Sequence, residues 1–162
     1  MGSPNESTSG PRAIESIVAG GIAVALLDAA NAVLFWYFYR GTEPHVIFQS
    51  IAAGLYGRAS FSGGMTTAWI GALLHCVIAF GVATTYYLGC LATPLLYRRA
   101  VLCGMTYGAI VYLVMNRIVI PLSNATPAPF RPAWFAANFG GHLLLVGLPV
   151  ALIARWSATR KR

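Results

Sequence analysis

The sequence predicts an all-α membrane protein with four transmembrane helices and one short interfacial or re-entrant helix in the loop between the first two. Of the 162 residues, 57% are hydrophobic and only 9% are charged. Soluble domains carry about 25% charged residues. A soluble chain of this length could not keep so much apolar surface from water, because small folds bury a limited fraction of their surface. A lipid bilayer is therefore the expected solvent and partner.

The chain divides into a tail, four apolar stretches and a second tail. Residues 1–12 are polar and rich in Ser, Gly and Pro, which predicts a flexible N-terminal tail. The transmembrane domain covers 13–155, and a basic C-terminal tail covers 156–162. The four apolar stretches cover residues 13–39, 65–90, 100–122 and 133–154. Each reaches the ~20 residues that a spanning helix needs, and none alternates in polarity as a membrane-barrel strand does.

Two of the connections have a character of their own. Residues 44–57 are apolar at most positions but too few to span a bilayer, which predicts an interfacial or re-entrant helix on the outer face. The connection between the third and fourth stretches holds Pro127, Pro129 and Pro132, so it cannot be helical throughout.

The basic residues predict the orientation, because cytoplasmic loops collect Lys and Arg. The two tails and the loop between the second and third stretches hold Arg12, Arg98, Arg99, Arg155, Arg160, Lys161 and Arg162. The two remaining loops hold Arg40, Arg58 and Arg131. Seven against three predicts that both termini are cytoplasmic.

The net charge of +7 does not indicate a nucleic-acid partner. The basic residues flank apolar stretches, where membrane topology explains them, and no Gly-rich phosphate loop or aromatic RNA-binding pattern accompanies them. The cysteines, Cys76, Cys90 and Cys103, have no CxxC spacing, which argues against a disulfide framework and against a zinc site. A homo-oligomer or a larger membrane complex stays open.

Each apolar stretch contains one ionisable side chain at a similar depth. These are Asp28, His75, Arg117 and His142, about 20 to 27 Å from the cytoplasmic ends at 1.5 Å per residue. Ionisable groups inside a membrane are costly and usually face the interior of a helix bundle. We therefore expect the four groups to converge.

Amides and small residues follow the same helix faces. Gly104 and Gly108 form a close-packing motif whose face continues to Asn116, and Asn138 lies one helical turn before His142. The predicted ligand- or ion-binding site consists of Asp28, Asn31, His75, Asn116, Arg117, Asn138 and His142. His45 and Gln49, one turn apart in the outer short helix, are candidates for its outer mouth or are ordinary interfacial residues.

Three interpretations of the polar layer remain open. A cavity could bind or pass a proton, an ion or a small solute, for which histidine is suited because its charge changes near neutral pH. Alternatively, Asp28 and Arg117 form an ion pair that only fixes helix register, since a lone carboxylate in lipid needs a partner. The protein is then a structural or accessory subunit of a larger complex. In the last interpretation, His75 and His142 hold a haem as axial ligands.

No catalytic residue is predicted. The sequence contains no HExxH or GxSxG motif and only one acid deep in an apolar stretch, so we do not expect an enzyme or a metal site.

The second half of the chain resembles the YagU-type bacterial inner-membrane proteins, a family of unknown function. The resemblance rests on 71–75 (GALLH) running into 78–80, on 104–121 with its late Pro-Leu, and on 141–143 (GHL) followed by the basic end at Arg155. It implies a small bacterial inner-membrane protein with intramembrane histidines in the second and fourth helices, and it supplies no catalytic residues.

Overall fold

The computed structural model describes residues 10–126 and 129–160, which are almost entirely helical and contain no strand. Four helical segments in this part of the chain are long and apolar enough to cross a membrane: Glu15–Arg40, Gly64–Ala92, Ala100–Leu122 and Pro132–Thr159. Their starts lie within two residues of the predicted ones. The prediction of an all-α chain with four helices long and apolar enough to span a membrane is confirmed, and the fourth helix runs five residues beyond its predicted end at residue 154.

The four long segments are not uniform helices. In chain order the elements are η1 (Glu15–Ala19), α1 (Gly20–Arg40), α2 (Pro44–Tyr56), η2 (Gly57–Ser62), α3 (Gly64–Ala92), α4 (Leu95–Arg98), α5 (Ala100–Val114), η3 (Met115–Val119), α6 (Ile120–Leu122), α7 (Pro132–Gly141), η4 (His142–Gly147) and α8 (Leu148–Thr159). The elements η1, η3 and η4 are single π-helical segments inside α-helical spans, and η2 is a 3₁₀-helix.

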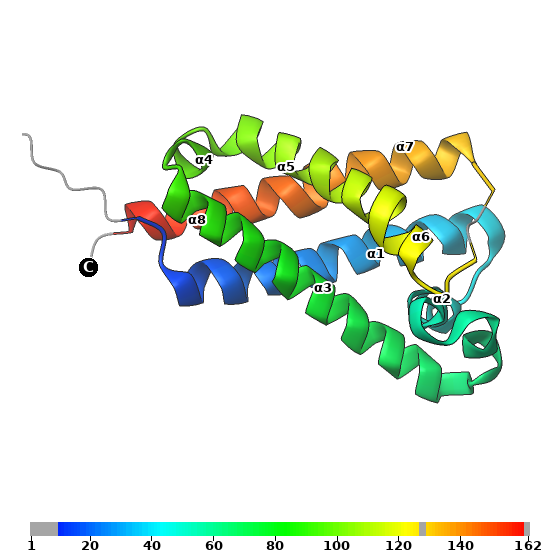
Figure 1. Cartoon of the computed structure of the whole chain (residues 1–162). Coiled ribbons are helices and arrows are strands. Elements are labelled where there is room, and N and C mark those ends of the chain that lie inside the picture. The colour runs from blue at the N-terminus through cyan, green and yellow to red at the C-terminus, as the bar shows by residue number, and fades with distance from the viewer. Residues whose placement is uncertain (1–9, 127–128, 161–162) are drawn as a thin grey trace, which may run out of the picture.

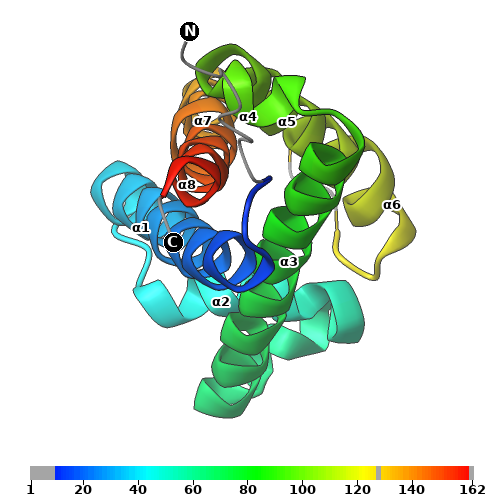
Figure 2. The ribbon, with the colours of Figure 1, turned by 90° about the vertical axis from the view of Figure 1, so that its left-hand side faces the viewer.

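The helices form two pairs of chain neighbours. α3 packs against α1 and α2, while α5 packs against η4 and α8, and α1 joins the pairs through α8. Both ends of the described chain and α4 lie at one end of the molecule, with α2 and α6 at the other (Figure 1). Seen along the bundle, α1, α3, α5 and α8 surround a common centre (Figure 2). We call the end with the two chain termini and α4 the termini end, and the end with α2 and α6 the loop end.

Glycines allow a very close helix approach between α5 and the fourth span. A Cβ atom added to Gly108 would collide with the main-chain oxygen of His142, and one added to Gly147 would collide with the main-chain oxygen of Gly104. A Cβ on Gly104 would lie 2.7 Å from that of Ala151. The predicted close-packing role of Gly104 and Gly108 is therefore confirmed, since only glycine lets two backbones approach this closely.

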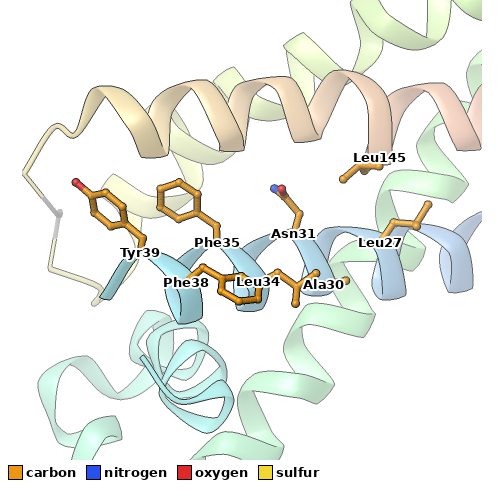
Figure 3. Close-up of a pocket in the computed structure, with 8 residues that line it drawn as sticks. All are labelled: Leu27, Ala30, Asn31, Leu34, Phe35, Phe38, Tyr39 and Leu145. Carbon is orange, nitrogen blue, oxygen red and sulfur yellow. The ribbon is translucent and has the colours of Figure 1, made fainter. Parts of the chain in front are cut away.

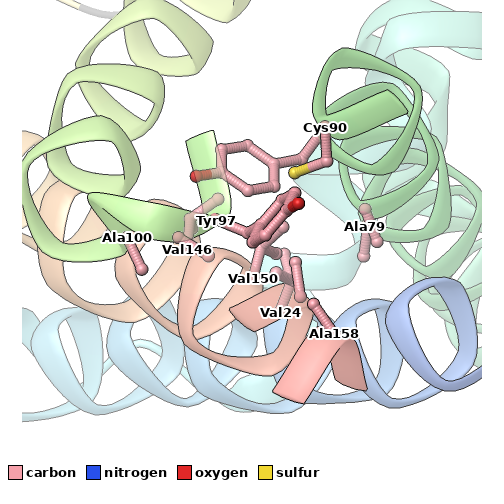
Figure 4. Packing of buried hydrophobic residues seen from close by; sticks show 12 residues of the cluster. Val24, Ala79, Cys90, Tyr97, Ala100, Val146, Val150 and Ala158 are labelled. Atoms are coloured by element: carbon pink, nitrogen blue, oxygen red, sulfur yellow. The ribbon is translucent and has the colours of Figure 1, made fainter. Parts of the chain in front are cut away.

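The buried core lies toward the termini end and consists mainly of small side chains and tyrosines (Figure 4). Tyr86 is fully buried and donates a hydrogen bond of 3.0 Å to the main-chain oxygen of Leu96. Tyr107 packs edge-on against Tyr86 and donates a hydrogen bond of 2.7 Å to the main-chain oxygen of Val82. These bonds satisfy polar groups that would otherwise destabilise an apolar interior. The first bond connects α3 with α4, and the second connects α3 with α5.

The predicted short helix of the first loop is present as α2. Pro44 occupies its first turn, where a missing N–H costs nothing, and Gly57 ends it with a φ of 59° that favours glycine. Its backbone crosses α3 so closely that a Cβ on Gly71 would collide with the main-chain oxygen of Phe48. Asn124 then fastens its end, through a side-chain hydrogen bond of 2.8 Å to the main-chain oxygen of Leu55.

Polar contacts also join the two ends of the chain. The hydroxyl groups of Ser16 and Ser157 are buried and lie 2.9 Å apart. Glu15 accepts hydrogen bonds from Arg12 at 2.9 Å and from Arg160 at 3.5 Å. The last residue of the predicted N-terminal tail is therefore packed, whereas 1–9 and 161–162 lie outside the described residues. The predicted C-terminal tail begins inside α8, which continues to Thr159.

Candidate functional site

Asp28 and His142 meet where α1 faces η4. The Nδ1 atom of His142 lies 4.0 Å from Oδ1 of Asp28 and 2.9 Å from the main-chain oxygen of Asn138. The carbonyl oxygen can only accept, so Nδ1 must carry a proton. In a neutral ring Nε2 is then a bare acceptor. Both side chains are largely covered, with 10% and 24% of their surfaces exposed.

His142 lines a cavity of about 360 Å³ at the loop end, between α5–η3 and α7. The polar lining residues are Asn116, Asn138, His142 and Arg131. The remaining lining residues are Tyr112, Met115, Ile120, Pro129, Phe130, Trp134 and Phe135. Ligand sites in proteins commonly have about 300–1,000 Å³ and combine apolar walls with a few placed polar groups. We call this space the loop-end cavity.

Two π-helical segments border the loop-end cavity. Asn116 belongs to η3, and His142 begins η4. A π-helical turn inserts one extra residue and rotates the following side chains, and such turns occur frequently at functional sites. Pro149 follows η4 at the start of α8, where the widened turn accommodates its missing N–H. The irregular backbone thus coincides with the polar residues.

Asn31 lies beside the site without lining the loop-end cavity. Its amide nitrogen donates a hydrogen bond of 3.4 Å to the main-chain oxygen of Ala137 and packs against Gly141, where a Cβ would be only 2.5 Å away. Figure 3 shows the side chain of Asn31 pointing from α1 toward the fourth span. Its observed contacts fasten α1 to α7.

His75 and Arg117 are placed apart from the cavity. His75 contacts α1 through Nε2, which lies 3.0 Å from the main-chain oxygen of Ala25. Arg117 is exposed on η3, and none of the ion pairs among the described residues joins it to Asp28. Asp28 therefore pairs with His142 and not with Arg117. The structure therefore brings Asp28 and His142 together and leaves the other two ionisable groups outside this contact.

The contacts of His45 and Gln49 stabilise α2 and its packing on α3. Nδ1 of His45 lies 3.1 Å from a carboxylate oxygen of Glu43, at the start of the helix. Gln49 is buried and donates a hydrogen bond of 2.8 Å to the main-chain oxygen of Gly64, at the start of α3. Neither residue lines the loop-end cavity. Gln49 instead connects the two helices that cross at Gly71.

A larger, open groove of about 630 Å³ follows α1 and is mostly apolar (Figure 3). Its lining residues are Leu27, Ala30, Asn31, Leu34, Phe35, Phe38, Tyr39 and Leu145. Leu34 and Phe38 are exposed, as side chains that face acyl chains would be. The groove offers one amide and one phenol over its whole length, so it has few groups that could recognise a polar ligand.

The histidines and other possible metal ligands do not gather. Among the described residues, no group of three or more His, Cys, Asp and Glu side chains is close enough to hold a metal ion. For a haem, Nε2 of His75 would have to leave the main-chain oxygen of Ala25.

The sequence predicts three of the residues that line the cavity, Asn116, Asn138 and His142, and not the other eight. Of these eight, Arg131, Trp134 and Tyr112 have side chains that can form hydrogen bonds. Trp134, Asn138 and His142 recur at helical spacing and share one helix face, and Arg131 directly precedes that helix, which is the signal that points to Trp134 and Arg131. Tyr112 stands edge-on to the ring of His142, with the ring centres 5.4 Å apart.

The four helices that are long and apolar enough to cross a membrane fit a small polytopic membrane protein. No protein-family model, curated protein or solved structure matches the chain. The resemblance to the YagU-type proteins accordingly stays a prediction.

Proposed function

We propose that this membrane protein binds a small solute in the loop-end cavity, with the Asp28–His142 pair taking up a proton. The observation that carries the proposal is the convergence of Asn116, Asn138 and His142 on one cavity inside an otherwise apolar bundle. Polar residues inside a membrane are costly and mark ligand or proton pathways. Transport of the proton or solute is the activity that such a site would serve.

The positions of the polar groups support this assignment. Asn138 and His142 lie about 9 and 15 Å along the helix from Pro132, at 1.5 Å per residue, so the cavity reaches from the loop toward the middle of the fourth span. His142 lines the cavity, and its Nδ1 atom lies 2.9 Å from the main-chain oxygen of Asn138 and 4.0 Å from Asp28, which leaves Nε2 free of these contacts. A histidine fixed in this way offers one ring nitrogen to a ligand or a proton.

We further infer a bacterial inner-membrane protein with cytoplasmic termini. The excess of basic residues at the termini end and the YagU resemblance support that orientation. The loop-end cavity then opens toward the outer side, and α2 lies in the outer interface. A structural or accessory subunit is the competing role, in which the polar groups serve packing alone.

Water access to the cavity provides the first test. In a variant without the three cysteines, Asn138→Cys should react with a small water-soluble thiosulfonate. Leu144→Cys is the matched control, because Leu144 is 53% exposed on the neighbouring face and would be covered by acyl chains. Equal protection of both positions would show that the cavity is not open to water and would contradict the proposal.

Proton flux provides the second test. Vesicles reconstituted with the protein and loaded with a pH-sensitive dye should acidify under an imposed gradient faster than empty vesicles. Asp28→Asn and His142→Gln should each abolish the difference, whereas Arg117→Gln should not, since Arg117 is exposed and unpaired with Asp28. Flux equal to that of empty vesicles, together with copurification of a larger protein, would favour the accessory role.

A further inference from the structure

We propose that the loop-end cavity is built for a small aromatic anion that carries a hydrogen-bond donor opposite its anionic group. The inference rests on the proposed binding function and names its ligand class. It combines three features of the lining: one cation near the loop, aromatic side chains between, and hydrogen-bond acceptors at the deep end.

The cation is Arg131. It is the only charged residue among the described residues that line the cavity, and its side chain is half-buried. The ion pairs of the described residues engage all three of their carboxylates elsewhere, Glu15 with two arginines, Glu43 with His45 and Asp28 with His142. An arginine without a carboxylate partner favours an anion, and its planar group pairs best with a carboxylate or phosphate.

The walls between the two ends are aromatic. Trp134, Phe135, Phe130 and Tyr112 line the cavity. Tyr112 stands edge-on to Phe135 with ring centres 5.9 Å apart, and Phe130 lies 5.8 Å from Phe135. Rings in these arrangements favour a planar, apolar ligand body, because aromatic groups pair in stacked and edge-to-face geometry.

The deep end presents acceptors. Nδ2 of Asn116 already donates a hydrogen bond of 2.9 Å to the main-chain oxygen of Tyr112, which leaves its Oδ1 atom as an acceptor. Nδ1 of His142 donates its hydrogen bond to the main-chain oxygen of Asn138. In the neutral ring this leaves Nε2 as an acceptor. A ligand hydroxyl or N–H group would satisfy either atom, whereas a second anionic group would be repelled by both.

The size of the cavity limits the ligand. Pro132 and His142 are about 15 Å apart along the helix at 1.5 Å per residue, and Arg131, which directly precedes Pro132, shortens the gap to the deep end with its long side chain. The volume of about 360 Å³ lies at the small end of ligand sites, which excludes fused multi-ring ligands with long chains.

Radiolabelled 4-hydroxybenzoate binding to the full chain in lipid nanodiscs tests the inference. At pH 7 its carboxyl group is ionised and its phenol keeps the proton. We expect 4-hydroxybenzamide, which has a neutral head, and 4-methoxybenzoate, which has no donor, to compete about tenfold or more weakly, because each loses one polar contact.

Variants separate the two ends of the site. Arg131→Gln should weaken 4-hydroxybenzoate about tenfold or more and leave 4-hydroxybenzamide unchanged, whereas Arg117→Gln should change neither. Asn116→Leu should remove the preference for the hydroxyl over the methyl ether, and His142→Phe should do the same if it folds. Asn116 is half-buried and makes one hydrogen bond, within its own helix, so we expect the Asn116→Leu variant to fold and to test the deep end even where His142→Phe does not fold.

The outcomes distinguish a failure of this ligand class from a failure of the proposed solute binding. Equal binding of the anionic and neutral probes, unaffected by Arg131→Gln, would overturn the anion assignment and leave solute binding intact. Binding of none of the probes, with Asn138→Cys still open to water, would likewise overturn the ligand class alone. Binding of none, with Asn138→Cys protected from water, would overturn both.

Discussion

The Nδ1 atom of His142 lies 4.0 Å from the Oδ1 atom of Asp28, across the contact between η4 and α1. Among the described residues, Asp28 is the only acid deep in a spanning segment, and the pair gives it a basic partner. The pair also joins two helices that are distant in the chain. The main-chain oxygen of Asn138 accepts a hydrogen bond of 2.9 Å from the same Nδ1 atom. The ring of His142 is therefore positioned by its own helix as well as by α1.

Removing one member of this pair should lower the free energy of unfolding more than removing both. His142→Leu leaves Asp28 without its partner, and we expect a loss of about 1–2 kcal/mol in unfolding free energy, the upper range for polar contacts within membranes. The double variant Asp28→Leu, His142→Leu should recover part of it. Unfolding by a denaturing detergent, followed by circular dichroism, measures both. Strictly additive losses would show that the two side chains are uncoupled.

The glycine crossing should be intolerant of even one methyl group. Gly108→Ala introduces a Cβ against the main-chain oxygen of His142, and we expect destabilisation of about 1–3 kcal/mol or more. Gly81→Ala is the matched control, because nothing lies within 4 Å of the added atom on this exposed face of α3. That change should be neutral or stabilising by up to about 1 kcal/mol, from helix propensity alone. Thermal unfolding in detergent would compare the two variants.

Labelling of single introduced cysteines on intact cells tests the inferred orientation in the membrane. In a variant without Cys76, Cys90 and Cys103, we expect Ser62→Cys to react with a membrane-impermeant maleimide on intact cells. Thr93→Cys should react only after permeabilisation. Both positions are exposed and lie at opposite ends of α3. The reverse pattern would invert the topology and place the loop-end cavity on the cytoplasmic side.

Asn124 should control how firmly α2 is held. Its side chain donates to the main-chain oxygen of Leu55, and its main-chain N–H donates to the oxygen of Gly54 at 3.0 Å. Asn124→Ala should raise the hydrogen exchange of the last turns of α2, because opening them then breaks fewer bonds. Ser50→Ala, which removes a bond to Ile47 one turn away, should leave that exchange unchanged.

The purified protein is expected to show no Soret band, with or without added haem. Axial ligation by Nε2 of His75 would require the loss of its contact with the main-chain oxygen of Ala25. An absorption spectrum after incubation with haem measures this directly. A Soret band that disappears in both His75→Gln and His142→Gln would establish the bis-histidine alternative.

The fold was predictable because lipid imposes a simple pattern. Runs of about 20 apolar residues and flanking bases suffice to place four spans, and the bilayer requires them to be helical. The proline at position 44 and the glycine at position 57 also marked the ends of α2. Close helix contacts at Gly104 and Gly108 followed from their spacing, since residues four apart share a face.

The site was only partly predictable. Depth along a helix follows from counting residues, whereas the direction of a side chain depends on helical phase, which a π-helical turn shifts. The segment η3 contains both Asn116 and Arg117, and only the first lines the cavity. Arg117 and Asp28 share a depth, but their directions differ, so equal depth did not predict contact. Arg131 escaped notice because loop arginines already have a topological explanation.

The pairing of helices has a consequence for biogenesis. Each main partnership, α1 with α3 and α5 with α8, joins spans that are consecutive in the chain, so a ribosome delivers each hairpin as a unit. Short-range closure of this kind is fast. The contacts that join the hairpins, Ser16 with Ser157 and Leu55 with Asn124, wait for later residues. Truncation of α8 before Ser157 would therefore remove the Ser16–Ser157 contact and keep the Leu55–Asn124 contact, which is complete once the third span has been made.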